Sequence, residues 1–195
     1  SPSNAAAAKP IAINQIVGAT VFTTAPHRDL MASARKAVYD GPLAVQGLQV
    51  CEAAGDSPCS LAPGLSDDER AARRCPAPNP SFTEIHGRVT LPVFQEGRPP
   101  FLDNGGKIQV DADGPVLHAV QDVCFALTVP NITAPAAGFP TLVFAHGTGG
   151  GFRDAAAGGT AEFAAEVGIA TLSLEGNLHG ERRGDTDTDG LIGGI

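Results

Sequence analysis

Stretches rich in apolar and β-branched residues, several of them alternating with polar positions, recur along the chain and predict β-strands. An alternation of period two is typical of a strand that buries one face and exposes the other. Between the first two stretches, Leu30, Ala34 and Val38 fall at helical spacing and predict a helix over residues 28–39. The predicted strands cover residues 11–24, 42–50, 81–94 and 116–130.

Two continuous apolar runs follow in the last third of the chain, at residues 141–145 and 168–174. Continuous runs of this kind are typical of buried parallel strands. Glycines follow the first run, and residues 155–167 then have helical character, weakened by Gly158 and Gly159. The order strand, glycine turn, helix, strand predicts one βαβ unit, and with it an α/β fold in which helices flank parallel strands.

The first part of the chain has a less regular pattern. Residues 51–80 are polar and rich in proline, with one short helix predicted to begin after a Ser66 cap and to reach Arg74. We therefore expect residues 1–80 to form an irregular, disulfide-held and β-rich region, either a lid over a site or a brace for the sheet. Residues 81–195 are expected to hold the first strands of an α/β domain.

Charge and hydropathy narrow the classes of partner. The 195 residues carry a formal net charge of −8 and include only three lysines. Nucleic acids and anionic membranes are bound by basic faces, so neither is expected as the main partner. No apolar run approaches the roughly 18 residues that a bilayer-spanning helix needs, so no membrane span is predicted.

Four cysteines, at positions 51, 59, 75 and 124, allow three disulfide pairings. In one of them Cys51 and Cys59 close a short turn-rich loop, and Cys75 ties the first region to Cys124. The absence of a C-x-x-C pair argues against zinc ribbons and thioredoxin-like redox motifs. The alternative is four buried free thiols in a cytosolic protein. Together with the acidic, lysine-poor composition, the even count favours an exported protein, which is secreted, periplasmic or held at the cell surface.

A glycine-rich stretch lies between a predicted strand and a predicted helix, with the sequence Phe-Ala-His-Gly-Thr-Gly-Gly from Phe144 to Gly150. Backbone N–H groups in such a turn can converge on an anion, because glycines permit unusual backbone paths and add no side chain. The glycine spacing does not fit the dinucleotide fingerprint G-x-G-x-x-G, and the Gly-Lys-Ser/Thr of a phosphate-binding loop is absent. Nucleotide binding is therefore not expected.

The same stretch resembles the His-Gly oxyanion loop that follows the third strand in the α/β-hydrolase superfamily, of the esterase and lipase type. Residues 138–144 are similar to the family's entry into that strand. Leu178-His179-Gly180 is similar to a His-Gly turn that many members carry after the next strand. The resemblance covers roughly residues 115–195 and implies the N-terminal part of an α/β-hydrolase sheet.

The resemblance also implies an oxyanion hole in this loop. Gly147 and Thr148 would supply backbone N–H donors to the charge that develops on the carbonyl oxygen of an ester substrate. His146 would orient the loop, and Gly149 and Gly150 would line the substrate pocket. Acyl transfer of this kind requires no cofactor.

The family's nucleophile elbow, G-x-S-x-G, does not occur in the sequence. The family's Ser, its Asp or Glu, and its His follow the oxyanion loop in that order, so we expect the triad on a second polypeptide or on a missing C-terminal part. The chain is thus expected to be the N-terminal part of a secreted serine hydrolase that cleaves carboxylic esters.

An acidic turn near the end of the chain supports a different function. Asp185, Asp187 and Asp189, followed by Gly190, match the opening of a calcium loop, in which alternate oxygen ligands wrap the Ca²⁺ ion. The preceding residues 181–183 are expected to form a surface ion-pair cluster. The alternative function is a non-catalytic extracellular binding domain stabilised by calcium. A third is a catalytically inactive hydrolase relative that makes protein contacts.

Overall fold

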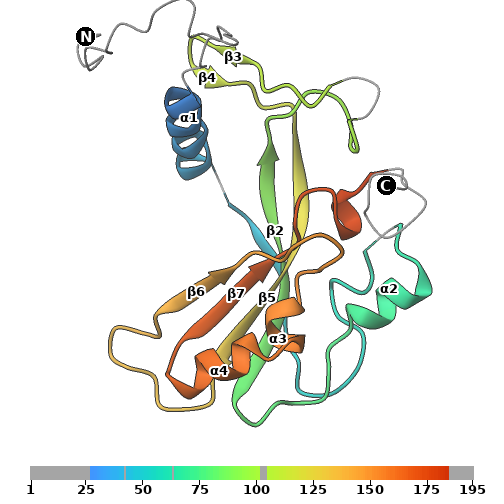
Figure 1. Cartoon of the computed structure of the whole chain (residues 1–195), viewed down its shortest axis with the longest axis vertical. Helices are drawn as coiled ribbons and strands as arrows, with labels where there is room; N and C mark the ends of the chain where they lie inside the picture. Colours follow the sequence, from blue (N-terminus) through green and yellow to red (C-terminus); the bar gives the residue numbers. More distant parts are fainter. Residues whose placement is uncertain (1–26, 42, 63, 102–104, 185–195) are drawn as a thin grey trace, which may run out of the picture.

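The computed structural model describes residues 27–41, 43–62, 64–101 and 105–184. They form a mixed α/β fold on one five-stranded sheet of order β1-β2-β5-β7-β6, with a separate two-stranded ladder of β3 and β4 (Figure 1). The large sheet consists of β1 (Val45–Val50), β2 (Phe82–Val93), β5 (Ala119–Pro130), β6 (Thr141–Phe144) and β7 (Ala170–Leu174). The small ladder consists of β3 (Val110–Asp111) and β4 (Gly114–Pro115). The helices are α1 (His27–Asp40), α2 (Asp67–Ala72), α3 (Asp154–Ala157), α4 (Thr160–Glu166) and the 3-10 helix η2 (Gly180–Arg182).

Two long strands, β2 and β5, form the spine of the sheet. They pair antiparallel over their full length, from Phe82 opposite Pro130 to Val93 opposite Ala119. β1 pairs antiparallel with β2, and β7 pairs antiparallel with β5, so β6–β7 is the only parallel ladder among the described strands. The predicted parallel arrangement is therefore wrong for most of the sheet. The described part of the connection from β2 to β5 contains no crossover helix, which neighbouring parallel strands usually need.

The predicted βαβ unit is confirmed, with β6 and β7 parallel and side by side. The predicted helix between them is broken into α3 and α4, and Gly159 at the break has a φ of 84°. A left-handed backbone at this position favours glycine and interrupts the helix. Helix α4 packs across β7, β5 and β2, where Ala161 and Ala165 bury Phe82 (Figure 1). Small side chains let this helix lie close to the sheet.

The first region supplies one helix against the small ladder and one strand of the main sheet. The helix predicted over 28–39 is confirmed as α1, which packs against β4, and β1 confirms the strand predicted over 42–50. Helix α2 begins with a capping box, in which Ser66 Oγ accepts the Glu69 N–H at 3.3 Å and Glu69 Oε2 accepts the Ser66 N–H at 2.7 Å. The strand predicted over 11–24 lies outside the described residues.

Two buried disulfides tie the irregular segment to the sheet. Cys51 pairs with Cys75, and Cys59 pairs with Cys124 in β5. The short loop between Cys51 and Cys59 is therefore not closed by a disulfide. The segment instead folds back so that Gly55 and Cys75 form a β-bridge, which brings Cys75 beside the end of β1.

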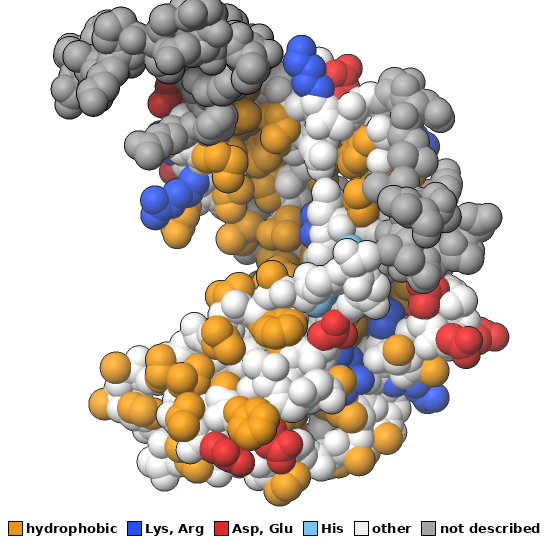
Figure 2. All heavy atoms as spheres, in the orientation of Figure 1, with side chains coloured by type: hydrophobic (Ala, Val, Ile, Leu, Met, Phe, Trp, Pro, Cys, Tyr) orange, Lys and Arg blue, Asp and Glu red, His pale blue; other side chains and the backbone are white. Residues whose placement is uncertain are grey.

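Apolar side chains are exposed at one edge of the sheet. No described strand covers the outer edge of β6, whose Leu142 and Val143 are 41% and 65% exposed, so the predicted burial of this run is wrong. Phe163 and Val167, in and just after α4, are also exposed, and Figure 2 shows apolar side chains gathered over this part of the molecule. Within the described ranges, no helix is long and apolar enough to cross a membrane.

Candidate functional site

The glycine loop lies at the carboxyl end of β6, beside the carboxyl end of β7 (Figure 1). Because the two strands are parallel, the segments that leave them emerge at the same edge of the sheet. His146 follows β6 at this edge, and Glu175 follows β7. Ligands of open α/β sheets bind outside the carboxyl ends of the strands, so the loop lies where a binding site is expected.

The backbone of the loop forms a tight turn, and two of its N–H groups lack a partner among the described residues. Gly150 donates its N–H to the carbonyl oxygen of Gly147 over 3.1 Å, and Gly149 has a φ of 76°. These are the features of a type II turn with Thr148 and Gly149 at its centre. The N–H groups of Gly147 and Thr148 donate to no other residue in the described part of the chain, and both residues are exposed. Both donors are therefore available to an anion.

His146 attaches the loop to the end of β7. Its side chain is only 1% exposed. Gly176 donates its N–H to Nε2 of the ring over 2.7 Å, and Nδ1 lies 3.0 Å from the carbonyl oxygen of Gly147. Because a carbonyl oxygen only accepts, we place the proton on Nδ1 and the lone pair on Nε2, which makes the ring neutral.

A buried cluster of charged side chains lies behind the loop. Arg73 pairs with Glu175 through one guanidinium nitrogen and with Glu181 through the other. Its Nε donates to the carbonyl oxygen of Cys59 over 3.0 Å, and the guanidinium lies 4.9 Å from the centre of the Phe152 ring. The cluster therefore connects the disulfide-tied segment before β2 to the end of β7 and to η2.

Glu175 is the most unusual member of this cluster. Burial raises the pKa of its carboxyl group against the opposing effect of Arg73, and the nearby charge of Glu181 adds to the rise. One carboxylate oxygen, Oε1, has no hydrogen-bond partner among the described residues, and it lies 3.4 Å from Nε2 of His146. Arg182, whose pKa is lowered by burial, donates to the backbone carbonyl of Glu175 over 2.9 Å.

A cavity of about 260 Å³ adjoins the loop. Its lining includes Gly149 and Gly150, the residues predicted for the substrate pocket, together with Arg73, Arg153 and Glu175. Gly147 and Thr148 belong to the same loop but do not line this cavity. Because pockets for drug-sized ligands occupy roughly 300–1,000 Å³, this cavity suits only a small chemical group.

The sequence did not reveal the charged cluster. Residues 181–183 were predicted to lie on the surface, but Glu181 is buried and accepts the backbone N–H of Cys124 over 2.8 Å. A local signal did exist for Glu175, since a charged residue that directly follows an apolar strand is either exposed or paired. No such signal existed for its partner Arg73, which lies 102 positions away along the chain.

A second buried group, formed by Cys51, Cys75 and His86, has the residue types of a metal site. The two sulfur atoms are joined in a disulfide, so neither is available as a thiolate ligand. Nε2 of His86 lies 2.7 Å from Glu84 Oε1, and Arg153 donates to the same oxygen over 2.7 Å. The group is therefore a structural network with its polar atoms paired.

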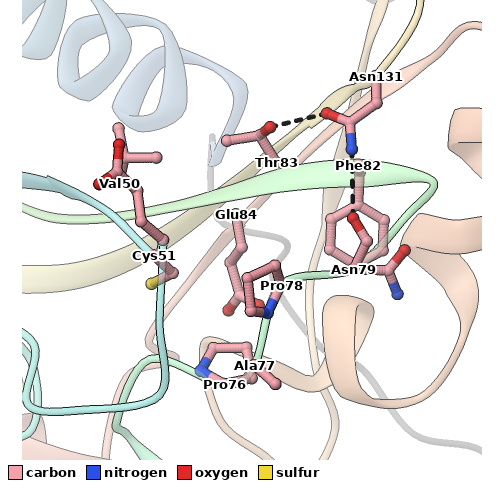
Figure 3. A pocket seen from close by; sticks show the side chains of 11 residues that line it. Val50, Cys51, Pro76, Ala77, Pro78, Asn79, Phe82, Thr83, Glu84 and Asn131 are labelled. Atoms are coloured by element: carbon pink, nitrogen blue, oxygen red, sulfur yellow. Dashed lines mark hydrogen bonds between the residues drawn. The ribbon is translucent and has the colours of Figure 1, made fainter.

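A pocket of about 230 Å³ lies at the start of β2 (Figure 3). Thr83 donates to the side chain of Asn131 over 2.7 Å, and Asn131 donates to the backbone carbonyl of Asn79 over 3.2 Å. Among the described residues, the buried side-chain atoms that lack a hydrogen-bond partner all belong to residues outside this pocket. The glycine loop therefore remains the better candidate for a functional site.

Asp185, Asp187 and Asp189, the predicted calcium ligands, lie outside the described residues, so this prediction stays untested. No protein-family model matches the chain, and neither curated proteins nor solved structures gave a match. The functional argument therefore rests on the residues and geometry of the chain itself.

Proposed function

We propose that this chain is the N-terminal part of a secreted serine hydrolase of the α/β-hydrolase superfamily, and that the protein cleaves carboxylic esters. The observation that carries the proposal is that the N–H groups of the exposed residues Gly147 and Thr148 donate to no described residue, on a turn at the carboxyl end of a parallel strand. The buried ring of His146 supports it, because this ring attaches the turn to the neighbouring strand, as expected of an orienting residue. The two disulfides are compatible with an oxidising, extracellular location.

In this proposal the chain contributes electrostatic stabilisation rather than the nucleophile. A serine hydroxyl attacks the ester carbonyl, and the negative charge that develops on the carbonyl oxygen is stabilised by the two N–H donors. The tetrahedral intermediate then expels the alcohol, and water hydrolyses the acyl-serine to release the acid. No serine of the sequence lies in a G-x-S-x-G elbow, and Ser173 of β7 is buried within the sheet, so the proposal assigns the nucleophile and its base to polypeptide outside the described residues.

A proline at position 148 tests the assignment of the donors. Thr148→Pro removes one N–H group, while proline is well suited to the second position of a type II turn, so the turn is expected to persist. Loss of one oxyanion donor lowers kcat by about 10²–10³-fold in serine hydrolases. We expect a decrease of that size for p-nitrophenyl butyrate hydrolysis by the complete protein.

Thr148→Ala is the matched control, because it removes the side chain and retains the N–H group. We expect its kcat to stay within a few-fold of the wild-type value. Equal activity of the Pro and Ala variants would show that this N–H group does not stabilise the transition state. No hydrolysis by the wild-type protein would contradict the proposed function itself.

A further inference from the structure

One buried carboxylate oxygen behind the loop has no donor. The side chain of Glu175 is 1% exposed, and Arg73 binds only one of its two oxygens. The other oxygen, Oε1, has no partner in the described part of the chain and lies 3.4 Å from Nε2 of His146. An unsatisfied charged group in the interior is costly, so its presence beside the loop calls for an explanation in terms of function.

The two atoms that face each other can hold one extra proton between them. The single lone pair of Nε2 already accepts the N–H of Gly176 over 2.7 Å. A proton added to Oε1 of Glu175, or to Nε2 of His146, would lie between these two atoms and replace that interaction. Acidification would thus break the hydrogen bond that attaches the loop to the end of β7.

We propose that Glu175 is a positioning residue for the glycine loop. Its carboxylate is ionised and bound to Arg73, and it donates no proton to Nε2 of His146. The lone pair of Nε2 therefore remains free to accept the N–H of Gly176. One proton taken up by the Glu175–His146 pair releases the loop and misplaces the N–H groups that follow His146. Oε1 of Glu175 and Nε2 of His146 lie 3.4 Å apart, so a proton taken up by either one lies between them. The kinetic part of this inference rests on the proposed esterase function, whereas the protonation of the pair does not.

The surroundings of the pair favour proton uptake at a higher pH than that at which an ordinary carboxyl group is protonated. Burial of Glu175 raises its pKa, and the charge of Glu181 in η2 adds to the effect. Arg73, directly after α2, opposes the rise without cancelling it. The other charged or titratable groups facing this region come from α2, η2, the loop after β7 and the start of α3: Glu69, Arg182, His179, Arg153 and Asp154.

Arg73 also explains what the irregular first region does for the site. It belongs to the segment between Cys51 and Cys75, which one disulfide closes and the disulfide from Cys59 ties to β5. The guanidinium is further fixed by the carbonyl oxygen of Cys59 at 3.0 Å. In this arrangement the segment is a brace that holds Glu175 behind the loop, rather than a lid over the site.

The first test compares the pH dependence of kcat/KM for p-nitrophenyl butyrate in the complete protein. We expect the wild-type activity to fall on the acid side. In Glu175→Gln the amide oxygen faces Arg73 and the NH₂ group faces Nε2 of His146, as in the protonated carboxyl group, so we expect kcat/KM to be low already at neutral pH and the acid-side fall to be lost. Glu166→Gln is the matched control, because it makes the same change at an exposed position in α4 and should leave the midpoint unchanged. A wild-type pH profile in Glu175→Gln would overturn the inference, provided thermal unfolding shows that the variant is folded.

The second test needs neither activity nor a stable Glu175 variant. Long-range ¹H–¹⁵N spectra of the wild-type protein, labelled at histidine and assigned with His146→Asn, report the protonation of each ring nitrogen. We expect Nδ1 of His146 to be protonated and Nε2 unprotonated at neutral pH, with a change at Nε2 upon acidification. A protonated Nε2 at neutral pH, or no change on acidification, would contradict the inference. An inactive protein with the expected spectra would refute the esterase proposal and leave the assignment of Glu175 intact.

Discussion

Three glycines around the site have no room for a side chain, and each lies against His146 or Glu175. A Cβ at Gly150 would lie 3.0 Å from Nδ1 of His146, and one at Gly176 would lie 2.8 Å from Cε1 of the same ring. A Cβ at Gly180 would lie 2.7 Å from Oε2 of Glu175. Distances below 3.0 Å are essentially never found for real Cβ atoms, and 3.0 Å is tighter than most of their contacts, so the backbone packs directly on His146 and Glu175.

An alanine at position 176 should therefore displace the ring of His146. Because a displacement of about 1 Å at a catalytic group can cost about 10²-fold in rate, we expect Gly176→Ala to lower kcat/KM for p-nitrophenyl butyrate by about that factor. Gly55→Ala serves as the control, since a Cβ there meets no atom within 4 Å. A Gly176→Ala variant as active as the control would show that the ring position does not matter for the reaction.

Individual residues also show where sequence reasoning succeeds and where it stops. The motif around His146 was found from its own neighbours, because the strand, the glycines and the turn are contiguous. The role of Glu175 becomes apparent only from its ion pair with Arg73, which lies 102 positions away in the sequence and is brought close by the fold. The disulfide partners of Cys51 and Cys59 were likewise decided by the fold, since spacing alone allows several pairings.

Among the elements, those with a local signal were predicted well. Helix α2 was expected after a Ser66 cap, and a full capping box is found there. One helix weakened by Gly158 and Gly159 was expected after β6, and the structure breaks it at Gly159 into α3 and α4. Strand direction and exposure were predicted less well, because β6 has the apolar character of a buried strand but occupies an edge of the described sheet. Such features depend on which strands are neighbours, and the sequence of one strand does not contain that information.

The capping box of α2 offers a test of an element that supports the site. Loss of an N-cap side chain typically costs about 1 kcal/mol, so Ser66→Ala should lower the free energy of unfolding by about that amount. Ser66→Thr keeps the hydroxyl group, which accepts the Glu69 N–H and donates to the Glu69 carboxylate, and should retain most of the stability. Urea denaturation of both variants measures the difference. Equal stability of the Ala and Thr variants would contradict the role of the cap.

At the level of the molecule, the disulfides join the irregular segment to the sheet. The bond from Cys59 to Cys124 spans 65 positions, and the bond from Cys51 to Cys75 spans 24. The chain-entropy estimate for closing loops of these lengths is about 4 and about 3 kcal/mol, so the longer loop should contribute more. Both bonds also keep Arg73 near the end of β7.

Replacing each pair of cysteines by alanine tests this difference. We expect the Cys59→Ala, Cys124→Ala variant to lose about 4 kcal/mol of unfolding free energy and the Cys51→Ala, Cys75→Ala variant about 3 kcal/mol. Denaturant unfolding without reductant, followed by circular dichroism, measures both losses. A wild-type protein whose stability is unchanged by reductant would show that these bonds do not stabilise the fold.

The central claim is that the N–H group of Thr148 stabilises the charge that forms when a serine attacks. The most direct measurement is the rate at which a fluorophosphonate labels the complete protein, followed by intact mass, because this reagent reacts with an activated serine through a similarly charged transition state. The account predicts one adduct, on a serine outside this 195-residue sequence. It also predicts equal rates for wild type and Thr148→Ala, and a rate about 10²-fold lower for Thr148→Pro. Absence of an adduct on the wild-type protein, or the same rate in all three proteins, would contradict it.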